Sequence, residues 1–390
     1  MEEKVKWATI IPLVGGSAIG CYNATGSKPL YHLSFSAFNK NEKPLEDYWP
    51  EVPRINLSEV QELPREKIDF INTVCPCAGL SLLSTSKSEE VRNKNNQWML
   101  ESADVVLGKI KPQVFWGENA PGLFTKMGNS VREILIEKAA KYGYSFSLYR
   151  TTTSLHGIPQ NRLRTFYFFW KSKTPPILGY YNRPYKPLAA YLQEIPSWAE
   201  GQDEFQFKGE IGDNSKTYSF ILNKLGISHK DFVQQNDGGS THSVQTYVAQ
   251  NNLIDECITW IEDGWGSDLK ELNRLKRIRD KLAAGGRFMD GSPAYYYEKC
   301  NALVGRNLTY ITHPTLARYM STREIMHLMG LPHDFEFSIK NYNMNILAQN
   351  VPTAPARDMT LEVLKFLKGE LDLHDTSTLK QDNIKQTIVE

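Results

Sequence analysis

The stretch KIDFINTVCPCAGLS, residues 67–81, joins an apolar, β-branched run to a loop that carries two thiols. The first half is typical of a strand buried in a parallel sheet, because its side chains are apolar on both faces. A similar run, WATIIPLV at 7–14, leads into a glycine pair. Ligands of sheets built from alternating strands and helices bind at the carboxyl ends of the strands. The two loops after these runs are therefore the first candidates for a site.

Helical and extended segments alternate around these two runs. Apolar residues at helical spacing predict helices over 95–111 and 129–142. Strands are expected at QVFWGEN (113–119), FSLYRT (146–151) and RTFYFFW (164–170). This alternation predicts a doubly wound α/β sheet within a first domain, residues 1–172.

The next segment, 173–310, is polar and rich in Asn, Gln, Gly and Pro, and it predicts a smaller, irregular domain. One amphipathic helix is expected there over 267–285, with Ser267 as its N-cap. Its inward side is expected to consist of Leu269, Leu272, Leu275, Ile278 and Leu282, and its basic side of Lys270, Arg274, Arg277 and Lys281.

Regular helical patterns return in 311–370, and this segment is expected to rejoin the first domain. Ser321 and Glu324 have the spacing of a capping box at the start of a helix, and a last helix is expected over 359–369. The polar tail 371–390 is expected to be disordered.

Composition narrows the class of protein. A chain of 390 residues with 41% hydrophobic content buries a core and is long enough for two domains. No apolar run reaches the ~20 residues of a membrane span, and no secretory leader is expected. Five cysteines, an odd number, predict free thiols in a reducing, cytoplasmic setting rather than a disulfide framework. The net charge of +1 neither requires nor excludes a nucleic-acid partner.

The two thiols of the opening stretch have different expected roles. Cys75 still belongs to the strand, so we interpret it as a buried core residue. Cys77 lies beyond the strand, where a neighbouring helix N-terminus lowers a thiol pKa and makes a thiolate nucleophile. A metal site is not expected, because one residue separates the thiols and no second Cys or His pair with zinc spacing lies nearby.

Several segments, in this order, together resemble the cytosine-5 DNA methyltransferase family. They are PCAGLS (76–81), GENAPGL (117–123), HGIPQNRLRTFYFF (156–169), HPTLARYMSTREIMHLMGLPHDF (313–335) and AQNVPTAPA (348–356). The resemblance covers roughly 1–172 and 311–366. It implies an S-adenosylmethionine-dependent methyltransferase sheet, and it leaves the middle domain to target recognition in double-stranded DNA.

The resemblance also implies the catalytic roles. Cys77 attacks carbon 6 of a flipped-out cytosine, and Glu118 holds or protonates ring nitrogen 3. Arg164 binds the carbonyl oxygen of the base, and Arg162 helps to hold the loop. Asn119 is implied as a brace for the cysteine loop, and the segment 81–95, beginning at Ser81, as the loop that closes over DNA.

The cofactor side departs from the family pattern. Thr9, Ile11 and Leu13 stand where the family has Asp, Phe and its first Gly. Neutral Asn56 and Ser36 stand where acidic residues bind the adenine amine and the ribose hydroxyls. Asn39, Asn41 or Glu42 are candidates to compensate. The resemblance implies a cofactor site made of Ile11, Gly15, Gly16, Ser36, Asn56, Leu57, Pro76, Met99 and Asn350. On sequence alone, Asn56→Asp is expected to tighten S-adenosylmethionine binding by about 1 kcal/mol.

Target recognition is expected in two places of the middle domain. QQNDGGSTHSVQTY (234–247) offers donors and acceptors to base edges, with Gln235 and Thr241 as candidates, although its composition also suits a surface loop. Lys270, Arg274 and Arg277 are expected to contact phosphates, although a merely solvated face has the same composition.

Alternatives stay open at this point. They are a catalytically inactive DNA-binding homologue, an RNA cytosine-5 methyltransferase and an enzyme with a modified sulfonium donor. A protein that acts as a monomer on DNA, in the nucleoid of a bacterial, archaeal or phage-infected cell, fits the sequence. The sequence does not specify the recognised DNA site or a restriction-modification partner.

Overall fold

The computed structural model describes residues 4–59, 62–76, 80, 89–195, 215–239, 243–267, 269–286, 294–305, 308, 310–337 and 345–377. Its contacts divide the chain into two units. The first unit is Met1–Tyr185, Leu328–Phe337 and Ile346–Glu390, and the second is Lys186–His327 and Ser338–Asn345.

A seven-stranded sheet forms the centre of the first unit, in the order β3-β2-β1-β4-β5-β8-β6. The strands are β1 Trp7–Ile10, β2 His32–Ser34, β3 Arg54–Asn56, β4 Phe70–Thr73, β5 Val114–Asn119, β6 Ser145–Thr152 and β8 Leu163–Trp170. Neighbouring strands pair in parallel from β3 through β2, β1 and β4 to β5. The predicted α/β sheet is confirmed, and the central strands β1, β4 and β5 are buried throughout.

Strand β8 adds a feature that the hydrophobic pattern did not specify. It lies antiparallel between β5 and β6. The chain turns back on itself after β6, through the short helix η5 Thr153–Leu155 and the strand β7 Gln160–Asn161, and an immediate return of this kind gives antiparallel neighbours. As a result, the segment expected to hold the two arginines runs alongside β5.

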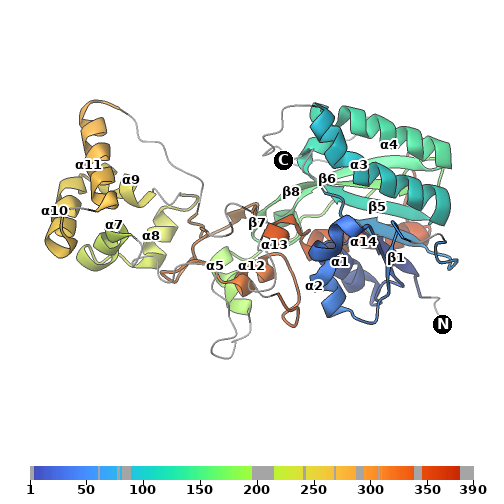
Figure 1. Cartoon of the computed structure of the whole chain (residues 1–390), viewed down its shortest axis with the longest axis horizontal. Helices are drawn as coiled ribbons and strands as arrows, with labels where there is room; N and C mark the ends of the chain where they lie inside the picture. The colour runs from blue at the N-terminus through green and yellow to red at the C-terminus, as the bar shows by residue number, and fades with distance from the viewer. Residues whose placement is uncertain are drawn as a thin grey trace. The chain divides into compact units, whose positions relative to one another are not determined.

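Helices cover the sheet on both faces (Figure 1). Helix α1 Gly16–Thr25 packs against α14 Thr353–Leu367, and α3 Glu89–Val105 packs against α4 Asn129–Tyr142. The helix predicted over 95–111 is α3 continued by a π-helical turn, η2 Val106–Ile110, and α4 has the predicted bounds. The remaining elements of this unit are η1 Ser36–Phe38, α2 Asn39–Tyr48, η3 Pro121–Phe124, η4 Lys126–Gly128 and most of α13 Asn345–Gln349.

The unit boundaries differ from the expected 172/173 and 310/311, for a reason visible in the side chains. Arg183 forms an ion pair with Asp358 of α14, and Tyr181 donates a hydrogen bond to Glu362, so residues 173–185 belong to the first unit. The tail from 371 was expected to be disordered, but its first residues are held: Ile177 donates to the carbonyl of Asp372. Residues 378–390 lie outside the described part.

The second unit was expected to be irregular, yet its described residues form a helical cluster. The helices are α5 Leu188–Tyr191, η6 Leu192–Glu194, α7 Lys216–Ser219, η7 Phe220–Lys224, α8 His229–Gln235, α9 Ser243–Gln250, α10 Ile254–Trp265, α11 Lys270–Ala283 and α12 Thr322–Leu328, with a short strand β9 Cys300–Asn301. Buried side chains from α7 to α11 share one core, which includes Tyr218, Phe232, Val248, Ile261 and Leu272. Most of these helices are short, so the sequence gives little periodicity to predict them from.

Of the local helix predictions, the capping box is confirmed, whereas the N-cap of α11 and the start of the last helix are wrong. Ser321 and Glu324 exchange the two hydrogen bonds of a capping box, as predicted, with N···O distances of 2.8 and 3.3 Å. Ser267 does not cap α11, whose N-cap is Leu269 with no side-chain cap bond. Leu282 was expected to point inward but is 38% exposed, because it lies in the last turn of α11, beyond the core. The last helix begins at Thr353, earlier than predicted.

No helix in the described part of the chain is long and apolar enough to cross a membrane. Within the same residues, no group of His, Cys, Asp and Glu side chains has the arrangement of a metal site.

Candidate active site

The ends of β4 and β5 bring together the starts of the two segments that were predicted to be catalytic. Thr73, the last residue of β4, pairs with Gly117 of β5. The cysteine loop follows β4 directly, and Glu118 and Asn119 complete β5. Parallel pairing places both at the carboxyl edge of the sheet, where the fold binds its ligands.

Glu118 is a buried carboxylate with a cationic neighbour. Its side chain is 3% exposed, and Arg164 Nε lies 2.5 Å from its Oε1 as an ion pair rather than an aligned hydrogen bond. Burial raises the pKa of Glu118, while Arg164 and Arg162 oppose that rise. A carboxyl group in this position keeps a proton to higher pH than usual and retains capacity to bond a ligand.

Two contacts behind Glu118 support the cysteine loop and helix α3. A Cβ added at Gly122 would lie 2.1 Å from the carbonyl oxygen of Leu80, so only glycine permits this close approach of the two backbones. Asn119 Nδ2 lies 3.8 Å from Met99 Sδ, and Met99 is buried. Asn119 therefore contacts α3 through Met99, while the roles predicted for Asn119 at the cysteine loop and for Met99 at the cofactor stay predictions.

Both thiols of the opening stretch come after β4, which ends at Thr73, so the prediction that Cys75 belongs to the strand is wrong. Cys75 is 2% exposed, its Sγ lies 3.2 Å from Thr73 Oγ1 and 3.7 Å from Ser102 Oγ, and burial raises its pKa. A thiol in that state is not a nucleophile, as expected for a core residue. Pro76 is half-buried at the start of the loop. Cys77 and Ser81, predicted to act on the base and the DNA, lie outside the described residues.

The loop between β1 and α1 holds unusual backbone. Ile11 and Leu13 have φ of 51° and 52°, the left-handed region, which costs a residue with a Cβ roughly 1–2 kcal/mol. Hydrogen bonds pin the first of them, from Ile11 N to Leu33 O and from Val74 N to Ile11 O. Both side chains are buried, so Ile11 shapes the site from beneath.

Gly16 and Asn350 meet at the start of α1. The Gly16 N–H donates to Asn350 Oδ1 at 2.8 Å, and a Cβ at Gly16 would lie 2.1 Å from the Val351 carbonyl. Gly15 precedes it with φ of 106°. Asn350 is buried, and its Nδ2 has no hydrogen-bond partner among the described residues. An unpaired buried donor beside a glycine loop suits an anionic ligand group such as a carboxylate.

Arg162 holds the segment that carries Asn350. It is 2% exposed, and its Nη2 donates to the carbonyls of Ala348 and Asn350 at 2.8 and 3.0 Å. Arg162 was predicted to help hold a loop, and among the described residues these hydrogen bonds join it to the segment that carries Asn350.

The neutral residues predicted to bind the adenosine part of a cofactor lie in contact. Asn56 Nδ2 donates to Ser36 Oγ at 2.8 Å and also to Glu59 Oε1, and Ser36 Oγ lies 3.5 Å from the same Glu59 oxygen. Glu42, a candidate to compensate, is buried elsewhere, accepting from Ser34 and Arg54, and burial raises its pKa to about 7. Asn39 Oδ1 accepts a hydrogen bond from Arg54, and Asn41 Nδ2 donates one to Gln349.

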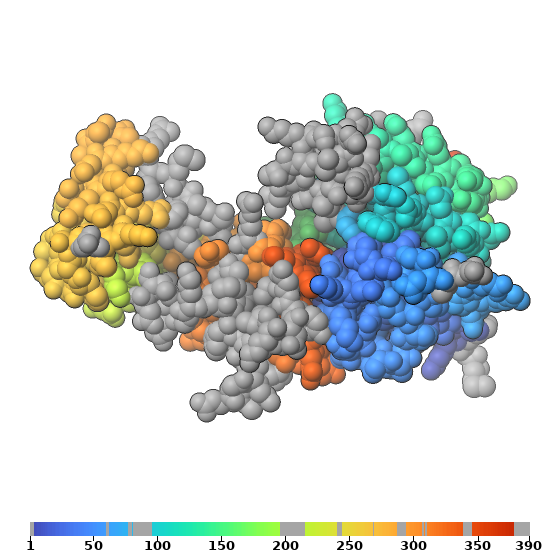
Figure 2. All heavy atoms as spheres, viewed as in Figure 1, coloured from blue at the N-terminus to red at the C-terminus, as the bar shows by residue number. Residues whose placement is uncertain are grey.

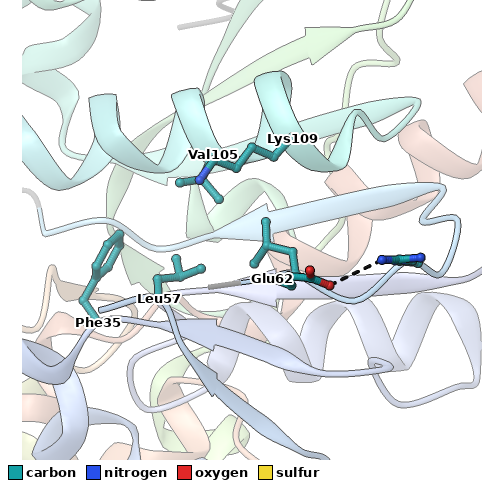
Figure 3. Close-up of a pocket in the computed structure, with 7 residues that line it drawn as sticks. Phe35, Leu57, Glu62, Val105 and Lys109 are labelled. Atoms are coloured by element: carbon teal, nitrogen blue, oxygen red, sulfur yellow. Dashed lines mark hydrogen bonds and ion pairs between the residues drawn. The ribbon is translucent and has the colours of Figure 1, made fainter. Parts of the chain in front are cut away.

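A pocket of about 340 Å³ opens beside Leu57. Figure 3 shows Phe35 and Leu57 on one side of it and Val105 and Lys109 on the helix opposite. Trp98 packs on Phe35 with ring centroids 4.7 Å apart. The sequence reasoning identified Leu57 but missed Phe35 and Val105, although Phe35 directly precedes Ser36.

The predicted DNA-contacting residues of the second unit lie on two helices. Gln235 is exposed at the end of α8, while Thr241 lies outside the described residues. Lys270, Arg277 and Lys281 are exposed along α11, whose surface Figure 2 shows in orange, and Arg274 is half-buried on the same side. In the described part of the chain, none of the three exposed side chains has an acidic partner. By contrast, Lys276 and Arg279 form ion pairs with Glu262 and Asp255.

Comparison with known proteins gives matches at both the sequence and the fold level. Residues 28–354 match the model of a family described as C-5 cytosine-specific DNA methylase. Type II methyltransferase M.BanI of Aneurinibacillus aneurinilyticus is 26% identical over 166 residues, 42% of this chain and 38% of that protein. Type II methyltransferase M.DdeI of Desulfomicrobium norvegicum is 21% identical over 285 residues, 69% of this chain and 64% of that protein. The chain therefore spans less than two thirds of either relative.

Among solved structures, a putative DNA modification methyltransferase encoded within an E. coli prophage superposes with a TM-score of 0.55 at 16% identity. The match covers 93% of this chain and 99% of that one. At this identity the likeness concerns the fold alone.

Proposed function

The chain belongs to the C-5 cytosine-specific DNA methylase family, and we propose on that basis that it methylates carbon 5 of cytosine in double-stranded DNA. The observation that carries the proposal is the buried Glu118 with its raised pKa, paired with Arg164 beside the loop of Cys77. A protein that only binds DNA has no need of a protonatable carboxylate, an arginine and a thiol at one strand edge. This is the argument against the inactive homologue.

The chemistry follows from the weakness of cytosine carbon 5 as a nucleophile. The Cys77 thiolate adds to carbon 6, and the ring electrons move toward carbon 5. Glu118, as the acid, holds a proton at ring nitrogen 3 so that charge does not build up there, and Arg164 steadies the carbonyl oxygen. After methylation, loss of the carbon 5 proton expels the thiolate and restores the aromatic ring.

The family uses S-adenosylmethionine as its methyl donor, which supplies a methyl group from its sulfonium when bound. The residues of the first unit fit this cofactor. Asn350 Nδ2, which has no hydrogen-bond partner among the residues that the structure describes, and the Gly15–Gly16 turn suit its carboxylate end, and the pocket beside Leu57 suits a flat ring. The unmodified donor is therefore preferred to a modified one.

The target base is inside the duplex stack, so the base must be flipped out, at a cost of a few kcal/mol. We propose that the protein acts as a monomer on DNA. We also propose that it acts in the nucleoid, because its DNA substrate is present there and the thiol of Cys77 stays reduced there.

Bisulfite sequencing of DNA from cells that express the protein tests the proposal. Protection of cytosines in one short sequence context, absent from cells with the empty vector, is expected. An RNA cytosine methyltransferase would instead leave the DNA unprotected and label RNA in a competition assay with both substrates. Loss of protection in every context would leave the inactive homologue as the better description.

The exposed basic stripe of α11, formed by Lys270, Arg277 and Lys281, leads to a prediction about DNA affinity. Changing Arg277 and Lys281 together to Gln is expected to weaken binding to all DNA sequences alike. Log affinity should also fall less steeply with log salt, the slope shrinking by about 1 for each lost phosphate contact. Fluorescence anisotropy over a range of salt concentrations measures both effects.

The matched control is Lys276→Gln with Arg279→Gln, which removes the same charge from residues already paired with acidic groups. An equal effect from both double variants would mean that net charge, not the stripe, sets the affinity. Changes at Gln235 or Thr241 are expected to alter which site is methylated, leaving the salt dependence unchanged.

A further inference from the structure

The adenosine side of the proposed cofactor site lacks both carboxylates that the family pattern places there. The fold nevertheless brings another carboxylate, that of Glu59, into contact with Ser36 and Asn56. We propose that Glu59, reached through the turn after β3, supplies the missing acceptor and binds the ribose hydroxyls of the cofactor. The inference rests on the proposed function, because it assigns a residue to the same cofactor.

The turn brings Glu59 to the two neutral residues. Ser58 N donates to Asn56 Oδ1 at 3.0 Å and Glu59 N to Asn56 O at 3.0 Å, so the chain doubles back directly after β3. Glu59 Oε1 thereby meets the amide of Asn56 and lies 3.5 Å from Ser36 Oγ. Asn56 thus orients the carboxylate.

Glu59 has capacity left for a ligand. It is exposed, and in the described part of the chain nothing donates to its Oε2. A carboxylate with a free oxygen, set against a serine hydroxyl, offers adjacent acceptors that match two neighbouring hydroxyl donors. The adenine amine has a separate acceptor in the second lone pair of Asn56 Oδ1.

The other nearby carboxylates do not offer this. Glu42 is buried and engaged with Ser34 and Arg54. Glu62 faces the pocket of Figure 3 but is paired with Arg65. Of the three, only Glu59 contacts both neutral replacements.

This arrangement reverses the sequence-based expectation for Asn56→Asp. An aspartate at 56 would place a second carboxylate against Glu59, and like charges at contact distance repel. The single change should therefore weaken cofactor binding, and removing the Glu59 charge at the same time should relieve the repulsion.

Calorimetry with S-adenosylhomocysteine and its 2′,3′-dideoxy analogue tests the assignment on the full chain. Glu59→Gln is expected to bind S-adenosylhomocysteine about tenfold more weakly than the wild type, the loss of a charge-assisted bond. For the dideoxy analogue, wild type and variant should bind equally. The double variant Asn56→Asp with Glu59→Gln should bind more tightly than Asn56→Asp alone, because the two carboxylates no longer repel each other.

The control is Glu66→Gln, which removes an exposed carboxylate from the same connecting segment and should bind as the wild type does. Equal affinity of Glu59→Gln and wild type for S-adenosylhomocysteine would overturn the proposal. A tenfold loss that persists with the dideoxy analogue would move Glu59 to the adenine and overturn the ribose assignment.

The two proposals fail in different ways. A wild type that neither binds S-adenosylhomocysteine nor protects DNA from bisulfite removes the proposed function and this inference with it. A wild type that does both, alongside an unimpaired Glu59→Gln, removes only the role of Glu59.

Discussion

Replacing Cys77 with serine is expected to abolish methyl transfer to DNA. By comparison with nucleophiles removed from other enzymes, the loss is on the order of 10⁶-fold. A serine hydroxyl is scarcely ionised near neutral pH, so it does not add to carbon 6 as a thiolate does. The covalent complex with DNA containing 5-fluorocytosine should vanish as well, because carbon 6 addition is its first step. A tritiated-methyl assay and denaturing gel electrophoresis measure the two effects.

Cys75→Ser is the matched control. Cys75 is buried, with Thr73 Oγ1 3.2 Å from its Sγ, so a serine there still has a neighbouring hydroxyl as a hydrogen-bond partner. Both methyl transfer and the covalent complex should survive. If Cys75→Ser lost both activities and Cys77→Ser kept them, the assignment of the nucleophile would be reversed.

Glu118→Gln is expected to slow methyl transfer by about 10²–10⁴-fold while leaving DNA affinity nearly unchanged, the size of effect for a lost general acid. Glutamine keeps the shape of the side chain, but its amide N–H is far too weak an acid to transfer a proton to ring nitrogen 3. Single-turnover assays separate this chemical loss from any change in binding. Glu137→Gln, on the exposed side of α4, should turn over normally.

The rate ratio of wild type to Glu118→Gln should also depend on pH. Burial raises the pKa of Glu118, so its proton persists above the usual range of a carboxyl and is lost as pH rises through the raised value. The advantage of the wild type is therefore largest below that pKa and shrinks above it. A ratio that stays constant with pH, or equal rates of the two proteins, would remove Glu118 from proton transfer.

Both predictions could be written from the sequence, because Cys77 and Glu118 lie in segments that resemble those of the cytosine-5 DNA methyltransferase family. Cys77 comes four residues after the end of the apolar strand β4, and Glu118 lies at the end of β5. The ordering of these segments along the chain identifies the edge of the sheet where they meet. The same is true of the Ser321 and Glu324 capping box, whose hydrogen bonds join residues within one turn. Signals of this kind depend only on steric preferences and hydrophobic periodicity over a few residues.

The contacts that complete the candidate site have no such local signal. Arg162 reaches Asn350 across 188 positions of sequence, and Gly16 reaches the same asparagine across 334. β8 pairs antiparallel with β5, and this pairing brings Arg164 to Glu118. The pairing depends on β5 having an edge free to accept another strand, which is a property of the whole sheet.

The cofactor side shows the division most clearly. The sequence by itself determined that Ser36 and Asn56 stand where acidic residues are expected, since that follows from counting along the chain. Only the tertiary structure decided that Glu59 reaches both, because a turn after β3 and the parallel pairing of β2 with β3 fix that approach in space. Position along the chain specifies which chemical groups are available, whereas the free energy of packing and hydrogen bonding over long sequence separations decides which of them meet.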